Sequence, residues 1–264
     1  MKTYLDKNVY EAALERIAYC FQEFDNVLVA FSGGKDSGVL LNLCYNYADE
    51  HGLLDKLTMY HLDYEAQYQM TTEYVTRTFL EQFPGIRKMW YCVPIKAQSA
   101  CALGEPYWTP WDAAKKKLWV RAMPENPYVV HEGNLDVPFR HGMVDYEFQD
   151  KLSRHFAKKR GTTAVMVGLR ADESLNRYAA VARGKKRRSY EGRKWITQTS
   201  AVTANVYPLY DWRVSDIWTA TARFGFDYNR LYDLLYQAGL TAGQMRVASP
   251  FNDCAQAQRP QLRR

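Results

Sequence analysis

Residues 27–37 read Val-Leu-Val-Ala-Phe-Ser-Gly-Gly-Lys-Asp-Ser, and this stretch decides the fold. Its first five residues form a continuous apolar run, which is typical of a strand buried on both faces of a parallel sheet. A polar, glycine-containing loop follows, after which Val39, Leu40 and Leu43 recur at helical spacing. The stretch therefore predicts a strand, a tight loop and a helix in direct succession.

The loop at 32–37 has the composition of an anion-binding site. Gly33 and Gly34 can adopt positive φ and let the main chain approach an anion closely. Successive N–H groups of such a loop form a nest for anions, and the first turn of the next helix adds further donors. Lys35 supplies a positive charge, and Asp36 can cap the helix or hold Mg²⁺. The alternative is an ordinary glycine turn with a helix cap.

The succession of a short apolar run and a helical segment repeats along the chain. Strands are expected at 27–31, 57–62, 88–93, 163–167 and 203–207. Helices are expected at 6–23, from about residue 36, at 66–82, 144–160, 215–222 and 228–239. This alternation implies right-handed crossovers and a parallel sheet. We predict an α/β fold with a doubly wound, mainly parallel five-stranded sheet and helices on both faces.

Residues 94–143 interrupt the alternation with many prolines and tryptophans. We interpret this stretch as an insertion with one short helix near 112–122. The α/β nucleotide-binding domain is expected to span 1–222 and to include the insertion. Residues 223–264 are expected to form a C-terminal helical segment and a tail.

The composition, with 47% hydrophobic and 24% charged residues, is ordinary for a globular protein. No apolar run reaches the roughly 20 residues needed to cross a bilayer, and the N-terminus lacks a signal-peptide core. We therefore predict a cytoplasmic protein with no membrane association. The net charge of +6 is compatible with nucleotides or nucleic acids as partners but does not identify one.

The five cysteines are odd in number, widely spaced and without a Cys-x-x-Cys pair. This pattern argues against a disulfide framework or a zinc knuckle. Cys20 and Cys44 fall in helical patterns and Cys92 in a strand pattern, so we expect all three to be core thiols.

Two further polar segments follow predicted strands, and ligands of open parallel sheets bind at the carboxyl ends of strands. Asp63 follows the second strand and can hold a ribose hydroxyl or a metal, or cap the next helix. Residues 168–174, Gly-Leu-Arg-Ala-Asp-Glu-Ser, follow the fourth strand. Arg170 and Arg177 can clamp phosphate oxygens, while Glu173 can orient Arg170 or bind a metal. The alternative for this segment is a capped helix start with surface charges.

A third segment, Tyr-Pro-Leu-Tyr-Asp-Trp at 207–212, is followed by Asp216 and Trp218. The ordered set resembles the PP-loop ATP pyrophosphatase superfamily, and within it the phosphoadenylyl-sulfate (PAPS) reductase-like branch. That branch carries S-G-G-K-D-S, G-x-R-x-x-E-S, and P-L-x-x-W followed by an acidic residue and Trp. The resemblance covers roughly residues 20–222 and implies a PP-loop/HUP-like fold. It also implies that the loop binds the pyrophosphate part of ATP and that ATP is split between its α and β phosphates.

The matching positions are specific. The residues that match the nucleotide loop are Ser32, Gly33, Gly34, Asp36 and Ser37. The residues that match the second anion-binding segment are Gly168, Arg170, Glu173 and Ser174.

The chain also departs from the true reductases of this branch. Those enzymes carry a catalytic cysteine in a C-terminal E-C-G-x-H-type segment, and some carry paired cysteines for an iron–sulfur cluster. Cys254 is the only late cysteine here, and its neighbours do not match, so no iron–sulfur cluster is expected. The sequence also resembles a bacterial and phage subgroup without the reductase motif. Members of that subgroup sit beside a ParB/sulfiredoxin-like partner protein, which implies a role in a multi-protein system.

Two basic segments lie outside these motifs, at 115–121 and 183–194. Together with nearby tryptophans they can hold a long polyanion such as DNA or RNA. The alternative is a solvated basic face with tryptophans packed over the edge of the core.

Three functional hypotheses follow. The first is an ATP-binding enzyme that adenylates an unknown acceptor and releases pyrophosphate. The second is a PAPS reductase or sulfur-transfer enzyme that uses Cys254. The third is a non-catalytic nucleotide-sensing subunit of a DNA-associated or phage-defence complex. A homo-oligomer is compatible with all three.

The first hypothesis assigns residues to roles. The expected catalytic residues are Lys35, Asp36, Arg170 and Glu173. The expected nucleotide-binding residues are Ser32, Gly33, Gly34, Lys35, Asp36, Ser37, Asp63, Gly168, Arg170, Ser174 and Arg177. Mg²⁺ is expected at Asp36 or Asp63.

Overall fold

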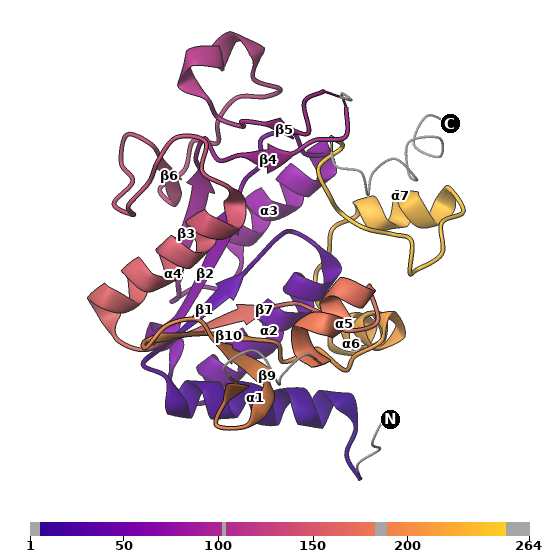
Figure 1. The fold of residues 1–264 in the computed structure, drawn as a ribbon. Helices are drawn as coiled ribbons and strands as arrows, with labels where there is room; N and C mark the ends of the chain where they lie inside the picture. The colour runs from indigo at the N-terminus through magenta and orange to yellow at the C-terminus, as the bar shows by residue number, and fades with distance from the viewer. Residues whose placement is uncertain (1–5, 102–103, 183–188, 252–264) are drawn as a thin grey trace.

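One large sheet organises the chain (Figure 1). The computed structural model describes residues 6–101, 104–182 and 189–251. The strands of this sheet are β1 (Asn26–Ala30), β2 (Leu57–Leu62), β3 (Arg87–Cys92), β6 (Val129–His131), β7 (Thr163–Val167), β8 (Ser189–Tyr190), β9 (Arg193–Gln198) and β10 (Thr203–Val206). Their order is β6-β3-β2-β1-β7-β10-β9-β8. The six strands from β6 to β10 are parallel to one another. β9 pairs antiparallel with β10, and β8 pairs antiparallel with β9.

The predicted α/β fold with a mainly parallel, doubly wound sheet is confirmed, since β1, β2, β3, β7 and β10 are the five expected strands. The predicted number of strands is wrong, because β6, β8 and β9 extend the sheet to eight. β6 has only three residues and lies within the proline-rich stretch. β9 reads Arg-Lys-Trp-Ile-Thr-Gln, which lacks the apolar run of a strand covered on both faces. Both strands are held by pairing with a neighbour and carry little local signal.

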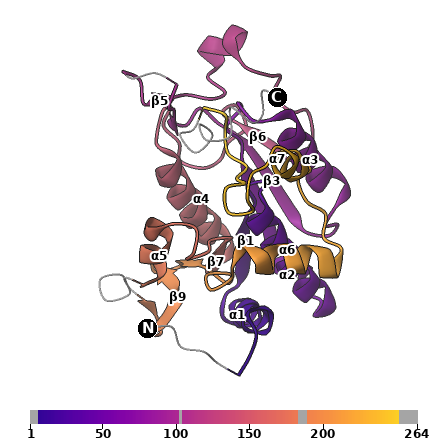
Figure 2. The ribbon, with the colours of Figure 1, turned by 90° about the vertical axis from the view of Figure 1, so that its right-hand side faces the viewer.

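Helices cover both faces of the sheet. Their bounds are α1 (Val9–Glu23), α2 (Lys35–Glu50), α3 (Gln69–Glu81), α4 (Asp145–Arg160), α5 (Leu175–Ala182), α6 (Val214–Phe224) and α7 (Leu231–Gln237). In Figure 2, α4 lies on the left of the sheet, and α2, α3 and α6 lie on the right. The expected helix near 112–122 is a short 3₁₀ helix, η2 (Ala113–Leu118). No helix in the described ranges is long and apolar enough to cross a membrane.

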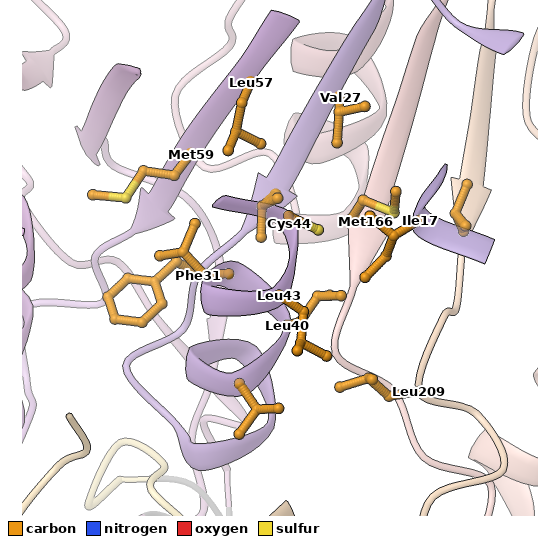
Figure 3. Close-up of a cluster of buried hydrophobic side chains, with 14 of the residues drawn as sticks. Ile17, Val27, Phe31, Leu40, Leu43, Cys44, Leu57, Met59, Met166 and Leu209 are labelled. Atoms are coloured by element: carbon orange, nitrogen blue, oxygen red, sulfur yellow. The ribbon is translucent and has the colours of Figure 1, made fainter. Parts of the chain in front are cut away.

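Two hydrophobic cores sit on the two faces of the sheet because successive side chains of a strand point in opposite directions. Val27 and Val29 of β1 join the core under α1, α2, α3 and α6, whereas Leu28 joins the core under α4. Figure 3 shows Leu40 and Leu43 of α2 against the first of these cores. Each such fully buried side chain contributes about 1.5–3 kcal/mol. The first turn of α2 is thereby fixed relative to β1.

Residues 94–143 pack over the carboxyl edge of the sheet. They contain a second sheet of two strands, β4 (Ala97–Gln98) and β5 (Tyr107–Trp108), together with η2 and β6. The carboxylate of Glu65 accepts hydrogen bonds from the main-chain N–H groups of Trp111 and Val120, both at 2.7 Å. Glu65 is buried, so these bonds hold the segment firmly to the end of β2.

Candidate functional site

The two predicted anion-binding segments meet where the strand order reverses. β2 and β3 lie on one side of β1, and β7 and β10 lie on the other. Crevices at such switch points are the usual ligand sites of open α/β sheets. A Cβ atom on Gly168 would lie 2.9 Å from the carbonyl carbon of Asp36 and 2.9 Å from the nitrogen of Ser37. Only glycine allows the segment after β7 to approach the first turn of α2 so closely.

The loop between β1 and α2 is shaped by its glycines and serines. Gly33 has φ +77°, and a Cβ there would lie 2.9 Å from Val75 Cγ2. The N–H of Ser32 donates to Ser37 Oγ at 3.1 Å, and Ser37 Oγ donates to the carbonyl of Gly34 at 3.0 Å. The serines therefore close the loop on itself. The predicted serine donors are engaged within the loop, which is preformed around the first N–H groups of α2.

The carboxylate of Asp36 contacts both cations predicted for this site, Lys35 and Arg170. Asp36 Oδ2 lies 3.2 Å from Lys35 Nζ, and Asp36 Oδ1 accepts a hydrogen bond from Arg170 Nε. Arg170 also pairs with Asp172 through Nη1. The Lys35 and Arg170 side chains are 4% and 3% exposed. Burial lowers the pKa of Arg170, but Asp36 and the neighbouring carboxylates outweigh it and raise that pKa, so the guanidinium stays charged.

The remaining predicted residues of the second segment hold the start of α5. Ser174 Oγ accepts from the N–H of Arg177 at 3.2 Å, which is the contact of a helix cap. Glu173 pairs with Arg177, with 2.6 Å between Oε2 and Nη1. In these contacts Ser174, Glu173 and Arg177 support the segment, whereas Arg170 is the residue that faces the first turn of α2.

Asp63 is fully buried at the end of β2, and its carboxylate is surrounded by donors. Arg121 Nη2 lies 2.6 Å from both oxygens, and Trp90 Nε1 donates to Oδ2 at 2.7 Å. The N–H of Glu65 donates to Oδ1 at 2.8 Å. These contacts favour an internal anchor between β2 and residues 94–143, and the role of Asp63 as a ribose or metal ligand stays a prediction.

Residues late in the chain cover the loop, and the sequence carried no signal for them. Tyr232 of α7 accepts a hydrogen bond from the N–H of Lys35 at 3.1 Å. Lys35 Nζ donates to the carbonyl of Met245 at 3.3 Å, and Arg246 Nη2 donates to the carbonyl of Glu173 at 3.0 Å. The segment after α7 thus contacts both anion-binding segments.

A pocket of about 220 Å³ opens beside the loop. It is lined by Ser32 after β1, Leu62 and Tyr64 at the end of β2, the β4–β5 pair, and residues 247–249. Among the described residues that line it, Asp145 carries the only charge. The pocket therefore suits a neutral or donor-bearing group rather than a second anion.

Tyr64 and Asp145 form a polar pair at this pocket. The hydroxyl of Tyr64 donates to Asp145 Oδ2 at 2.9 Å. Burial, and then the charge of Asp145, raise the pKa of Tyr64, so the phenol stays protonated. The pair leaves acceptor lone pairs of the carboxylate available to a ligand.

Asp36 can accommodate the predicted Mg²⁺. Each carboxylate oxygen offers about two lone-pair sites, so its pairs with Lys35 and Arg170 leave acceptor sites free. Mg²⁺ usually takes one or two carboxylates together with substrate phosphates. The described ranges hold no cluster of three or more His, Cys, Asp or Glu side chains that would bind a metal unaided. The residues therefore fit an ion that arrives with the phosphates.

The thiols Cys20, Cys44 and Cys92 are buried, as predicted for core residues. Burial is the first cause that raises the pKa of each. Cys101 is exposed. Cys254 lies outside the described residues, so its predicted role stays a prediction.

The two basic segments are described in part. Residues 183–188 of the segment 183–194 lie outside the described residues, and the remainder forms β8 and the start of β9. Lys115, Lys116 and Lys117 of the other segment are exposed on η2. Lys116 Nζ lies 5.7 Å from the ring centroid of Trp119. Binding of DNA or RNA by these segments stays a prediction.

Comparison with known proteins gives one curated relative and several solved structures. The uncharacterized protein YbdN of Escherichia coli (strain K12) is 34% identical over 250 residues, which cover 94% of this chain and 60% of that protein. The chain thus spans 60% of its relative's length. The phosphoadenylyl-sulfate reductase of Candida auris, in a phosphate complex, has a TM-score of 0.47 and 14% identity, covering 94% of this chain and 97% of its own.

The FMN adenylyltransferase of Candida glabrata, in complex with FAD and inorganic pyrophosphate, has a TM-score of 0.48 and 14% identity. The comparison covers 88% of this chain and 65% of that one. Residues 26–238 match the family model of the phosphoadenosine phosphosulfate reductase domain, from β1 to the end of α7. The resemblance seen in the glycine loop is confirmed by that match, and the chain belongs to the phosphoadenosine phosphosulfate reductase domain family of PP-loop proteins.

Proposed function

We propose that the chain binds ATP at the switch point and transfers its adenylyl group to an acceptor, with release of pyrophosphate. The observation that carries this proposal is the convergence of two cations on one carboxylate. Lys35 and Arg170 come from different motifs and both contact Asp36, beside the first N–H groups of α2. Two buried cations and a helix N-terminus form a suitable cradle for a polyphosphate.

Each residue has a role in this proposal. The N–H groups of the loop and Lys35 hold the β and γ phosphates. Arg170 has five N–H donors, of which Nε contacts Asp36 and Nη1 contacts Asp172, so others remain for the α-phosphoryl oxygens. Asp36 positions both cations, and it would hold Mg²⁺ together with phosphate oxygens, where the ion would neutralise the leaving pyrophosphate.

In the proposed reaction, an acceptor oxygen forms a bond to the α-phosphorus while the bond from that phosphorus to the bridging oxygen breaks. Pyrophosphate leaves with the electron pair, and the proton of the acceptor passes to water. The chain's contribution is positioning and charge stabilisation, which are the main sources of catalysis in phosphoryl transfer.

The pocket beside Ser32 would take the adenosine part of ATP. Trp108 and Tyr64 offer aromatic surface, and the Asp145 carboxylate can accept a hydrogen bond from the exocyclic amino group of adenine. A carboxylate would repel the carbonyl oxygen that guanine has at the same position. The pocket therefore supports a preference for ATP over GTP.

The experiment that tests the proposal is mass spectrometry of the products after incubation with ATP and Mg²⁺, with and without DNA as a candidate acceptor. We expect AMP or an adenylylated acceptor together with pyrophosphate, and we expect Lys35→Met to abolish their formation. Lys151→Met, which alters a half-buried lysine paired with Glu147 on α4, is the control. ADP with inorganic phosphate would contradict cleavage between the α and β phosphates. Calorimetric binding of ATP without turnover, with or without the ParB/sulfiredoxin-like partner, would favour the nucleotide-sensing subunit instead.

A second candidate function is sulfonucleotide reduction or sulfur transfer through Cys254. One observation favours it: Phe251, three residues before that cysteine, is held beside the pocket. Its carbonyl accepts from the N–H of Ala100 at 2.7 Å, next to the β4–β5 pair. Cys254→Ser should abolish thiol-dependent turnover of a sulfonucleotide if this function is correct, and an unchanged rate would remove it.

A further inference from the structure

A second pocket, of about 160 Å³, lies between β3, α4 and the loop after β6. The directions of the strands place this pocket away from the switch point. Arg87, which lines it, is the first residue of β3, and Arg160, which also lines it, is the last residue of α4. β3 runs parallel to β2 and β1, so this amino end lies at the opposite edge of the sheet from the nucleotide loop. The proposed adenylyl transfer makes no use of this pocket.

The side chains that line this pocket carry more positive than negative charge. Lys159 Nζ pairs with Asp136 at 2.7 Å, and His155 Nε2 lies 3.6 Å from the same carboxylate oxygen. Arg87 and Arg160 have no ion pair with a carboxylate anywhere in the described ranges, and Asp136 is the only acidic side chain among the lining residues. Two guanidinium charges are therefore left without a counter-charge.

Arg87 is held in this arrangement by weak contacts. Its Nη1 donates to Thr58 Oγ1 at 3.4 Å, which is a long hydrogen bond. Burial lowers the pKa of Arg87, and the charge of Arg160 lowers it further. The two cations thus line one pocket and repel one another, at a cost in free energy that no ion pair with a carboxylate in the described ranges offsets.

The usual preference for basic residues at the end of a helix explains only part of the positive charge at this pocket. Lysine and arginine in the last turn of a helix stabilise its terminal carbonyls, which accounts for Lys158, Lys159 and Arg160. Arg87 belongs to a strand, and the same argument gives no reason for it to line the same pocket as Arg160. An anion in the pocket would supply the missing charge.

The rest of the pocket is apolar. Met89, Tyr91 and Phe156 lie among its lining residues, from β3 and α4. His155 Nε2 is buried, and its 3.6 Å separation from Asp136 Oδ2 is longer than an ordinary hydrogen bond. A ligand that combines a compact oxyanion with a flat apolar group would contact both the charged and the apolar part.

We propose that this pocket binds a phosphate monoester, with the phosphate between Arg87 and Arg160 and the esterified group against the apolar lining. A phosphate monoester carries about −1.5 to −2 charges at pH 7, which matches two unpaired guanidinium groups. The planar fork of arginine fits phosphate oxygens in pairs. The monoester belongs either to a small metabolite or to the terminal phosphate of a nucleic-acid strand.

The test is calorimetric titration of the full chain with phenyl phosphate. Because the nucleotide loop can also bind anions, the titration is made in the Lys35→Met background. Arg87→Gln with Arg160→Gln should weaken binding at least tenfold. Arg154→Gln with Lys158→Gln removes two positive charges from exposed positions of the same helix, and this control should change affinity less than twofold. Equal affinity of the two double variants would overturn the proposal.

Two further measurements complete the test. Arg160→Gln alone alters an exposed side chain, so it keeps the result interpretable if the double variant is poorly folded, and a weakening of at least threefold is expected. Unchanged binding in this single variant would also overturn the proposal. A short single-stranded DNA with a 5′-phosphate is then compared with its 5′-hydroxyl form. A tenfold gain from the phosphate, lost in Arg87→Gln with Arg160→Gln, supports a strand end as ligand, and equal binding of the two supports a small phosphate monoester.

The proposal does not depend on the proposed adenylyl transfer. Loss of pyrophosphate release in Lys35→Met with retained phenyl phosphate binding would support both. Pyrophosphate release by the wild-type chain that is lost in Lys35→Met, together with failed phenyl phosphate binding, would remove this proposal alone.

Discussion

Asp36 and Arg170 form an ion pair across the switch point, although 134 residues separate them in the chain. Asp36 stands in the first turn of α2, and Arg170 follows β7. The same carboxylate contacts Lys35, so one side chain sets the position of two cations from two motifs. The nucleotide site is in this sense assembled around Asp36.

Replacement of Asp36 should affect both stability and turnover. Without Asp36 the buried Lys35 loses its carboxylate, while Arg170 keeps Asp172. Leaving a buried charge without its partner costs about 3–5 kcal/mol. We expect Asp36→Ala to lower the free energy of unfolding by an amount of that order and to abolish pyrophosphate release. Urea denaturation and a pyrophosphate assay measure the two effects. Asp233→Asn, at the exposed pair with Arg230, is the control and should change stability by less than about 1 kcal/mol.

Gly168→Ala should weaken nucleotide binding through the main chain alone. The new Cβ would lie 2.9 Å from main-chain atoms of Asp36 and Ser37, so β7 and α2 must separate. We expect at least tenfold weaker ATP binding by calorimetry, and a loss of about 1–3 kcal/mol of stability from overpacking. Gly243→Ala, where a Cβ meets nothing within 4 Å, should leave both unchanged. Equal behaviour of the two variants would contradict the close approach described above.

Tyr232→Phe tests the contact of α7 with the nucleotide loop. The change removes the hydroxyl that accepts from the N–H of Lys35 and leaves a buried donor without a partner. That loss costs about 1–3 kcal/mol. Thermal denaturation should show a lowered midpoint, together with a changed affinity for pyrophosphate. Tyr236→Phe is the matched control because Tyr236 lies on the same helix and is 72% exposed.

His61 predicts a dependence of stability on pH. Burial lowers the pKa of His61, whose Nδ1 lies 2.8 Å from the carbonyl of Phe31 directly before the loop. The unfolded chain takes up this proton at a higher pH than the folded chain, so stability is present above about pH 6.5 and falls as the pH drops below it. Urea midpoints from pH 8 to pH 5 should decline, and His61→Gln should flatten that decline. An equal slope in the variant would show that another group is responsible.

Asp145→Ala should alter the choice of base. The carboxylate lines the pocket beside Ser32 and is proposed to accept from the amino group of adenine. Its removal should weaken ATP binding about tenfold and bring ATP and GTP affinities closer together, since one discriminating hydrogen bond contributes about 1–3 kcal/mol. Glu147→Ala, two residues further along α4, is the control and should leave the ratio of ATP to GTP affinity unchanged. A ratio that is unchanged in both variants would contradict the placement of adenine in this pocket.

The first half of the nucleotide site could be predicted from the sequence because its signals are local. The apolar run of β1, the two glycines and the first turn of α2 are contiguous, and each has a conformational meaning by itself. Gly168 and Arg170 could be added because they follow another apolar strand. Parallel strands bring such segments to one edge of a sheet whatever the sequence between them.

Other features depend on distant contacts that no local pattern reports. Tyr232 meets Lys35 across 197 residues, and nothing around α7 distinguishes this tyrosine from the others. Asp63 stands at the end of β2, where the sequence predicts a ligand-binding residue. Its carboxylate instead pairs with Arg121 from the segment 94–143. The sequence of β9 contains charged residues and does not predict a strand. The strand forms through pairing with β10.

The contact of Tyr232 and Met245 with Lys35 has a consequence for synthesis on the ribosome. Domains tend to fold from the N-terminus as the chain emerges. The loop after β1 appears before its cover, which arrives more than 190 residues later. Until then the Lys35 amide must rely on water, and the ammonium has only water and the adjacent Asp36 as partners. A nascent chain stalled before α7 would hence present an open, hydrated phosphate loop, and full affinity for a nucleotide would come only after α7 and the segment after it have been translated.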